Sequence, residues 1–253
     1  MRVMSMNACT DQLVLLLLPL ERIASVTYLA ERSAVTPQLA AKARGVRVNH
    51  GLAEEMLADR PDLVIAGRFT TPAARRMAQA AGAPLLIVDS ADTFDAIRAT
   101  TRQVAAAAGE TERGEALLQR MDATLAALKA SAPQRRVTAI AWDGSGRVPG
   151  RASLFNEILE AAGGVNLAAR PGQFQSSLDL EQLLALTPQP QLLLYGSPDA
   201  AQPGLALEAV RHPVLEHAYA GRRLAVPEYA CGTPEAANQA LALRRQLQSA
   251  AAR

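Results

Sequence analysis

The chain has 253 residues, of which 49% are apolar and 20% charged, as is typical of a globular protein that can bury a sizeable core. Its 26 Lys and Arg against 24 Asp and Glu give a net charge of only +2, without long basic runs and with a single Trp, which argues against nucleic-acid binding. The longest strongly apolar run, Leu13–Leu18, is far shorter than the roughly 20 residues of a membrane span, and nothing frames it as a signal peptide. We expect either a cytosolic protein or an exported one given without its signal.

Strand and helix patterns alternate in the first part of the chain. Short, continuously apolar runs such as Leu63–Ala66 are typical of strands buried on both faces of a parallel sheet. Helices are predicted from Thr10 or Asp11, from Leu52, and from Thr71–Pro72, where the proline suits a first turn. The predicted strands cover residues 2–6, 23–28, 63–66 and 84–89. This alternation indicates a parallel α/β sheet with right-handed crossovers.

Residues 92–132 have a different pattern. Asp92 or Thr93 can cap one helix, which ends at Gly109, and Thr111 can cap a second that runs to about Ala130. Apolar residues recur along the second helix at Leu117, Leu118, Met121, Leu125 and Leu128. This is an amphipathic helix of about 20 residues, roughly 30 Å long, and we expect it to be a stiff spacer between two α/β segments.

After Pro133 the alternation of strands and helices starts again. Strands are predicted over 136–142, 192–196 and 223–226, and helices over 153–162, 179–186 and from Pro234. Asp179 and Gln182 have the spacing of a capping box.

The two halves share a local pattern. Pro61–Gly67 matches Pro190–Gly196 position for position, and each follows a Leu-rich helix. Together with the strands that open at Val3 and Val137, this match favours two copies of one lobe. We therefore expect an N-terminal lobe over 1–91, linking helices over 92–132 and a C-terminal lobe over 133–253.

Catalytic and metal-binding motifs are scarce, and we do not expect an enzyme. Gly144–Gly150 comes near the dinucleotide fingerprint, but no helix begins within it, so we interpret it as a flexible loop. Of the three histidines, His212 and His217 fall on predicted surface, and only His50, in a loop before a helix, could face a cleft. Glu54–Glu55 is explained by the helix dipole, which favours negative charge in a first turn.

Open α/β sheets bind ligands at the carboxyl ends of their strands. Five aromatic residues and two arginines fall near such ends, which indicates a broad pocket for a large, partly apolar ligand that could be anionic. Rim packing is the alternative for any single aromatic residue. The candidate ligand-binding residues are Asn7, Cys9, Tyr28, His50, Arg68, Phe69, Trp142, Arg151, Tyr195 and Tyr229.

The cysteines, Cys9 and Cys231, are too few for a cysteine-only zinc site, which takes four ligands. They are either a disulfide formed in an oxidising compartment or two separate, half-buried thiols.

Several segments in order resemble the periplasmic binding proteins that serve ABC importers of cobalamin and ferric siderophores, and the resemblance covers nearly the whole chain. The segments are Ser5–Gln12, Leu20–Thr27, Pro61–Gly67, Leu154–Leu159, Gly163–Asn166, Ser177–Leu186 and Cys231–Pro234. The resemblance implies two Rossmann-like lobes on a rigid helical backbone, with a ligand cleft between them. It also implies a periplasmic monomer without an intrinsic cofactor, which delivers a ferric siderophore or cobalamin-like corrinoid to an ABC permease in the inner membrane.

In such a fold Cys9 and Cys231 would lie at cleft-facing ends, one on each lobe, and we expect a disulfide between them that restricts opening.

The chain departs from the family at Asn49–His50, where cobalamin-binding members often have an aromatic residue. It also lacks an acidic residue for permease docking around Pro72–Arg75, although Glu54, Glu55, Asp199 and Glu208 could substitute. A chelatase-like enzyme on the same fold, or a binder of bare metal ions through His50 and carboxylates, remains an alternative.

Overall fold

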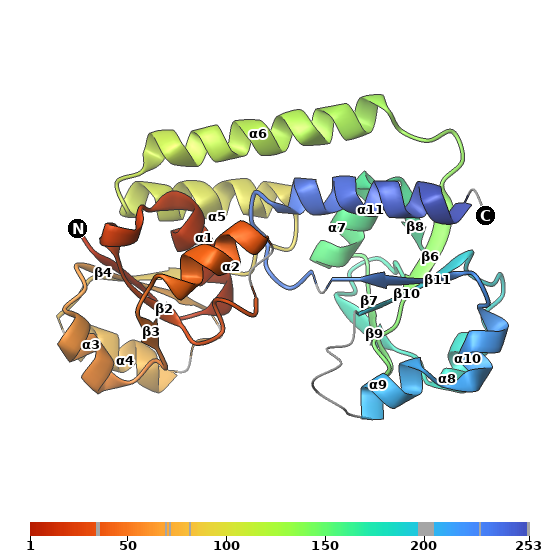
Figure 1. Cartoon of the computed structure of the whole chain (residues 1–253), viewed down its shortest axis with the longest axis horizontal. Coiled ribbons are helices and arrows are strands. Elements are labelled where there is room, and N and C mark those ends of the chain that lie inside the picture. Colours follow the sequence, from red (N-terminus) through yellow and green to blue (C-terminus); the bar gives the residue numbers. More distant parts are fainter. Residues whose placement is uncertain are drawn as a thin grey trace. The chain divides into compact units, whose positions relative to one another are not determined.

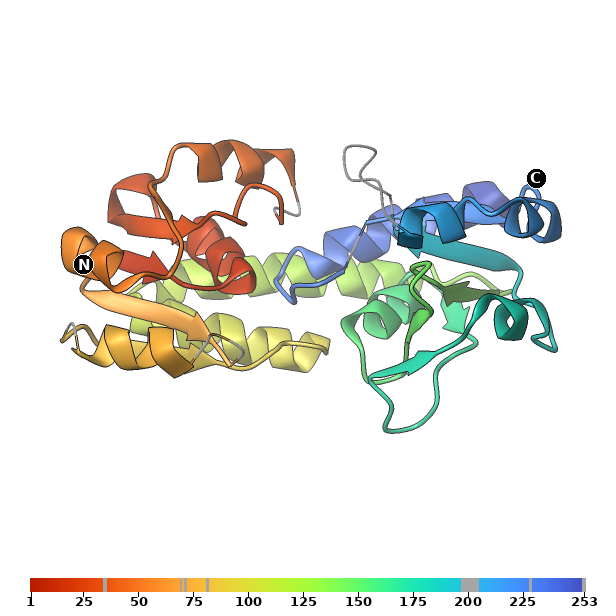
Figure 2. The same ribbon diagram turned by 90° about the horizontal axis from the view of Figure 1, so that it is seen from below.

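A computed structural model describes residues 1–33, 36–68, 70, 72–80, 82–196, 205–227 and 229–251 (Figures 1 and 2). Contacts divide the chain into two compact units, one comprising Met1–Arg120 and Cys231–Glu235, the other Met121–Ala230 and Ala236–Arg253. The predicted α/β class, with a parallel sheet in each part, is confirmed. Among the described residues, no helix has both the length and the apolar character needed to cross a bilayer.

The first unit contains five parallel strands in the order β3-β2-β1-β4-β5. These strands are β1 (Val3–Ser5), β2 (Ile23–Thr27), β3 (Val48–Asn49), β4 (Leu63–Gly67) and β5 (Leu85–Val88). Its helices are α1 (Ala8–Leu17), the 3-10 turn η1 (Leu20–Arg22), α2 (Pro37–Arg44), α3 (Ala53–Asp59), α4 (Pro72–Ala80), α5 (Phe94–Ala107) and the first half of α6 (Thr111–Ala130).

Helices cover both faces of this sheet, and alternate strand residues supply the two cores. Val3 packs in a cluster with side chains of α1, α2 and α5, whereas its neighbour Met4 packs with Met56 of α3 and Ala78 of α4. Figure 1 shows α3 and α4 together on one side of the strands. This two-sided burial explains why the strands read as continuous apolar runs.

The second unit has four parallel strands in the order β11-β10-β6-β8 and a separate antiparallel ribbon of β7 and β9. The strands are β6 (Val137–Ala141), β7 (Arg147–Pro149), β8 (Gly164–Asn166), β9 (Gln175–Ser177), β10 (Leu192–Gly196) and β11 (Arg223–Val226). The helices after α6 are α7 (Leu154–Ala161), α8 (Leu180–Leu184), α9 (Leu205–Val210), α10 (Pro213–Ala218) and α11 (Ala236–Ala251). One core of this unit gathers Ile140, Leu183, Leu215 and Tyr219, and α7 packs against α11.

The two sheets share a topology. In the first unit, β1 pairs with β2 on one side and with β4 on the other, and β5 lies beyond β4. In the second unit, β6 likewise pairs with β8 and with β10, and β11 lies beyond β10. The segments that matched in sequence therefore form equivalent strands, which confirms the predicted repeat; the second sheet lacks a counterpart of β3.

The units divide differently from the predicted lobes. The division falls at Arg120, within α6, because α5 packs against α1 and β5, and Leu117 of α6 joins the core of the first unit. The short segment Cys231–Glu235 also belongs to the first unit. Residues 144–150 are not simply a flexible loop, because 147–149 form β7.

Candidate functional site

The carboxyl ends of β1, β2, β3 and β4 lie at one edge of the first sheet, and each is followed by a predicted site residue. Asn7 follows β1, Tyr28 follows β2, His50 follows β3 and Arg68 follows β4. Because all four strands are parallel and adjacent, these residues share the edge at which such sheets bind ligands.

An aromatic pair forms the centre of this edge. The rings of Tyr28 and His50 stack with centroids 5.4 Å apart and planes inclined by 14°. Both side chains reach solvent, and Tyr28 is 57% exposed. The pair offers a flat, partly apolar surface with two polar atoms at its rim.

Glu55, in the first turn of α3, holds His50 in place. Its carboxylate accepts hydrogen bonds from the backbone N–H of His50 at 2.7 Å and of Leu52 at 2.9 Å, and lies 3.0 Å from His50 Nδ1. Partial burial acts to raise the pKa of Glu55, but these hydrogen bonds outweigh it and lower that pKa. In the neutral imidazole, Nδ1–H therefore donates to an ionised carboxylate and Nε2 keeps its lone pair.

The backbone behind the aromatic pair is fixed by a buried amide. Asn49 Nδ2 donates to the carbonyl oxygen of Ser5 at 2.9 Å and lies 3.0 Å from Ser25 Oγ. The Asn49 carbonyl accepts the Tyr28 N–H at 3.0 Å. Both ring-bearing loops are therefore tied to the sheet, so the aromatic pair is preorganised.

Asn7 and Cys9 lie at the start of α1 and have structural partners. Asn7 Oδ1 caps the helix by accepting the N–H groups of Cys9 at 2.9 Å and Thr10 at 3.4 Å. A Cβ on Gly67 would lie 2.9 Å from the Asn7 amide, so the glycine leaves the room that this cap needs. Cys9 is bonded to Cys231 in a disulfide. The pairing is as predicted, but both cysteines belong to the first unit, so the expectation of one cysteine on each lobe is wrong.

Arg68 is largely exposed and lies 3.6 Å from the carboxylate of Asp89, which is exposed as well. An ion pair in water contributes little to stability, so the guanidinium can exchange this partner for a ligand at small cost. Phe69 and Asp199 lie outside the described residues.

The predicted site residues of the second unit have different surroundings. Trp142 is only 3% exposed, and its indole N–H donates to the Leu178 carbonyl at 2.9 Å. Its own N–H also donates to the Leu194 carbonyl at 2.9 Å, which extends the sheet pairing by one residue. Trp142 is therefore a core residue, and the prediction that it lines the ligand surface is wrong.

Tyr195 and Tyr229 are half-buried, whereas Arg151 is exposed. The Tyr195 ring packs against the second core with the Arg223 guanidinium 5.1 Å from its centroid. The Tyr229 ring lies 6.1 Å from that of Phe155, and burial raises the pKa of its phenol. Of these residues, Arg151 is the one presented to solvent.

Sequence reasoning missed two residues of interest, one in each unit. Glu55 was assigned only to the helix dipole, although its position three residues after Leu52 is the spacing of a capping box. Phe174, which is 53% exposed, follows the turn signal Pro171-Gly172 after β8, and that signal could have marked an ordered loop.

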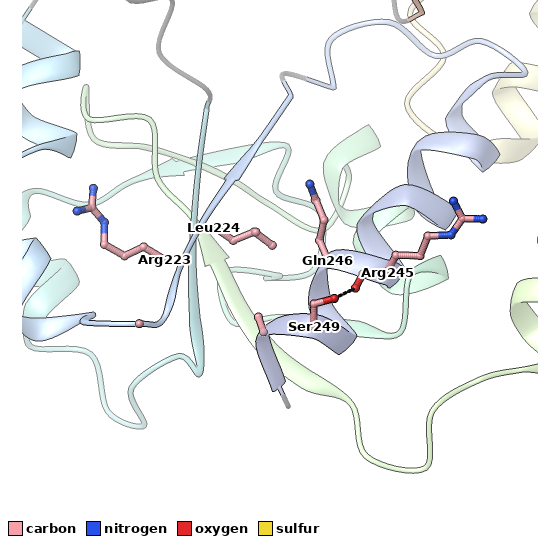
Figure 3. Close-up of a pocket in the computed structure, with 7 residues that line it drawn as sticks. Arg223, Leu224, Arg245, Gln246 and Ser249 are labelled. Atoms are coloured by element: carbon pink, nitrogen blue, oxygen red, sulfur yellow. Dashed lines mark hydrogen bonds between the residues drawn. The ribbon is translucent and has the colours of Figure 1, made fainter. Parts of the chain in front are cut away.

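A pocket of about 260 Å³ lies between β11 and α11 (Figure 3). Its lining includes Gly221 and Arg223, so it lies near the amino end of β11. Figure 3 shows the guanidinium groups of Arg223 and Arg245 directed away from each other. No charged groups converge there, and this pocket is not the candidate site.

In the described part of the chain, no three His, Cys, Asp or Glu side chains gather closely enough to hold a metal ion.

The sequence model of the periplasmic binding protein family matches residues 3–225. The periplasmic heme-binding protein RhuT from Roseiflexus sp. RS-1, in apo form, is 25% identical and has a TM-score of 0.78, with 99% of this chain and 98% of that chain covered.

Two other solved structures are less similar in sequence. The periplasmic heme-binding protein HutB of Vibrio cholerae is 19% identical, with a TM-score of 0.78 and 98% of each chain covered. The vitamin B12 binding protein BtuF of Vibrio cholerae is 18% identical, with a TM-score of 0.69, covering all of this chain (100%) and 98% of that one. At these identities both show the shared fold alone. Among curated proteins, none matches the chain significantly.

Proposed function

Because the chain belongs to the periplasmic binding protein family, we propose that it captures a metal chelate in the periplasm and delivers it to an ABC-type permease. Within the chelates, we propose an iron porphyrin, whose metal His50 binds through Nε2. The likeness to RhuT, a heme-binding protein, supports this class over the ferric siderophores and corrinoids that the sequence indicated.

The observation that carries the proposal is the state of His50. Metal-binding histidines commonly donate their second ring N–H to a carboxylate, which fixes the tautomer and makes the free nitrogen a better ligand. His50 has this arrangement, with Nδ1 held by Glu55 and no described residue hydrogen-bonded to Nε2. Tyr28 stacks on the same ring and limits its rotation.

This geometry distinguishes between chelates. A hexadentate siderophore surrounds its ferric ion completely and leaves no position for a protein ligand. Iron in a porphyrin keeps its axial positions open, and a histidine is a common axial ligand of heme. The flat Tyr28–His50 surface also suits a planar macrocycle.

The test is an absorbance titration of the oxidised protein with ferric protoporphyrin IX. We expect His50→Ala to weaken binding by on the order of 100-fold and to remove the spectrum of a histidine-bound iron, and Glu55→Gln to weaken binding by about tenfold. His217→Ala is the matched control, because His217 is an exposed histidine on α10.

Metal-free protoporphyrin IX separates ligation from stacking. If His50 binds the iron, His50→Ala should change the affinity for the metal-free ring far less than the affinity for the ferric form. Equal losses for both rings would refute ligation through His50. Saturable binding of a siderophore or cobalamin, with no response to the porphyrin, would replace the proposed ligand.

A further inference from the structure

The Tyr28 ring belongs to a compact turn of residues 27–33, which follows β2 in the first unit. Within the turn, the N–H and the hydroxyl of Ser33 both donate to the Leu29 carbonyl at 2.9 Å. Because more than half of the Tyr28 side chain is exposed, core packing alone does not fix its direction. That direction depends on how the backbone of the turn is held.

The hydroxyl of Thr27 links the start of this turn to α1. It donates to the carboxylate of Asp11 at 2.5 Å and accepts the Leu29 N–H at 3.3 Å. The side chain of Asp11 is fully buried and Thr27 is only 7% exposed, so these bonds form away from water, where each is stronger. One hydroxyl therefore holds the backbone on both sides of Tyr28.

A second side chain of α1 holds the far end of the turn. Gln12, which is only 1% exposed, donates a side-chain N–H to the Ser33 carbonyl. It directly follows Asp11 in the first turn of α1, and the Asn7 cap and the disulfide at Cys9 fix that part of the helix. The turn is therefore anchored at both ends to one helix of the same unit.

The anchored turn determines where Tyr28 meets His50. The two rings stack with centroids 5.4 Å apart, and this contact is present in the protein without a ligand. A side chain that is already fixed loses little conformational freedom when a ligand packs on it. If the turn could shift, the ligand would have to order Tyr28, and its affinity would fall by the cost of that ordering.

We infer that Thr27 and Gln12 are positioning residues, which hold the Tyr28 ring against His50 before a ligand binds and so raise the affinity for a planar ligand. The inference rests on the proposed function for its consequence in binding. Both side chains are buried, so they act through Tyr28 and do not contact the ligand themselves.

The first measurement uses the protein without a ligand. The ring protons of His50, assigned by comparison with His50→Ala, report in proton NMR the aromatic ring that stacks on them. Tyr28→Ala should shift these resonances, and Thr27→Val and Gln12→Leu should shift them in the same direction, because each removes an anchor of the turn. Thr27→Ser keeps the hydroxyl and should leave the resonances in place. Thr101→Val is the matched control, because Thr101 is a buried threonine of α5 whose hydroxyl has no partner among the described residues.

The second measurement is the affinity for ferric protoporphyrin IX. Thr27→Val and Gln12→Leu should each weaken binding by about three- to tenfold, whereas Thr27→Ser and Thr101→Val should bind like the unaltered protein. In a Tyr28→Ala background neither Thr27→Val nor Gln12→Leu should weaken binding further, because the ring through which they act is absent.

The two measurements separate this inference from the proposed function. Unchanged His50 resonances in both Thr27→Val and Gln12→Leu, or the same loss of affinity with and without the Tyr28 ring, overturn the positioning role and leave porphyrin capture intact. If the porphyrin does not bind at all but the resonances shift as expected, the proposed function fails, and the positioning of Tyr28 is supported by the resonances. Circular dichroism of each variant establishes that the fold is unchanged.

Discussion

Asp11, in the first turn of α1, shows how a single polar residue joins two elements of the first unit. Its side chain is fully buried, and its carboxylate accepts the Thr27 N–H at 3.1 Å and the Thr27 hydroxyl at 2.5 Å. Burial raises the pKa of Asp11, although hydrogen bonds from Ser5 and Thr27 act in the opposite direction. The carboxylate therefore connects α1 to β2, but its charge carries a desolvation cost.

Replacement of Asp11 separates these two effects. Asp11→Asn keeps an acceptor for the Thr27 N–H and removes the buried charge, so we expect the free energy of unfolding at neutral pH to be unchanged or higher. Asp11→Ala leaves the buried N–H unpaired, and we expect a loss of about 1–3 kcal/mol. Urea denaturation of the two variants beside the unaltered protein measures both effects.

The pH dependence gives a second, independent readout. In the unfolded chain the Asp11 carboxyl has a pKa of about 3.9, and in the folded protein its pKa is raised. Between those two pKa values the folded state binds more protons at Asp11, so the contribution of Asp11 to the unfolding free energy falls as pH rises through that window. The advantage of Asp11→Asn should therefore grow with rising pH. An advantage that is constant, or that grows toward low pH, would contradict the role of burial.

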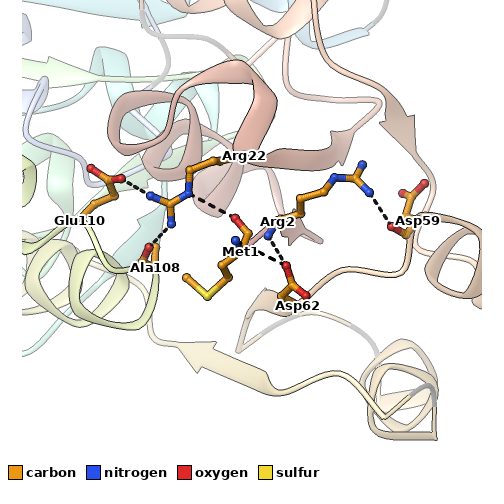
Figure 4. Close-up of polar contacts among 7 residues, drawn as sticks. All are labelled: Met1, Arg2, Arg22, Asp59, Asp62, Ala108 and Glu110. Carbon is orange, nitrogen blue, oxygen red and sulfur yellow. Dashed lines mark hydrogen bonds and ion pairs between the residues drawn. The ribbon is translucent and has the colours of Figure 1, made fainter.

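At the scale of secondary structure, basic side chains satisfy the carbonyl groups that helices leave free at their carboxyl ends. Lys42 donates to the carbonyls of Leu15 and Leu18 at the end of α1. Arg22 donates to Ala108, just after α5, at 2.6 Å and also pairs with Glu110 (Figure 4). These contacts fix the carboxyl ends of α1 and α5.

Arg244 of α11 caps two helices at once. It is buried and donates to the carbonyls of Leu128 at 3.1 Å and Ser131 at 2.8 Å near the end of α6, and to those of Ala161 and Ala162 at the end of α7. No carboxylate is among these partners, so the partial negative charges of the helix ends stabilise the guanidinium.

We expect Arg244→Met to lower the free energy of unfolding by about 3–5 kcal/mol, because several buried carbonyls lose their donor together. The exposed neighbour Arg245 is the matched control, and Arg245→Met should change stability by less than about 0.5 kcal/mol. Urea denaturation followed by circular dichroism measures both. Similar small effects from the two substitutions would show that water replaces the guanidinium at no cost.

Local sequence patterns explain which helices and strands could be predicted. The continuous apolar runs of β4 and β10 and the 20-residue repeat pattern of α6 are local signals, and the structure confirms them. The ribbon depends on pairing of residues 147–149 with 175–177, whose sequences have no strand pattern, so it could not be predicted locally. The start of α2 carried a usable signal in Thr36-Pro37 that was not recognised.

The candidate site, like the fold, could be predicted only in part from the sequence. Tyr28 and His50 lie at strand ends, as the parallel-sheet rule requires. The predicted strand 136–142 already ended at Trp142, so the error concerned the face on which this side chain lies, which is the core of the second unit. Successive side chains of a strand point to opposite faces, and the sequence of 136–142 does not show which face is the core.

At the scale of the whole chain, the segment Cys231–Glu235 follows a strand of the second unit but belongs to the first. A Cβ on Gly232 would lie 1.8 Å from the Ala91 carbonyl oxygen, so the segment packs directly against that backbone. The disulfide from Cys231 to Cys9 spans 222 residues and fastens the segment to the start of α1. Two distant parts of the sequence therefore form one unit.

The disulfide should contribute strongly to stability, because it removes much of the freedom of the unfolded chain. For a loop of this length the chain-entropy description gives an upper value of about 5 kcal/mol, so we expect Cys9→Ser with Cys231→Ser to lower the free energy of unfolding by about 2–5 kcal/mol in urea denaturation. The unaltered protein treated with a thiol reductant should lose the same amount, which separates loss of the covalent bond from an effect of the serines. Reduction without a change in the denaturation midpoint would mean that packing of Gly232 against Ala91 already holds the segment. In that case the bond would add no stability to the contacts that surround it.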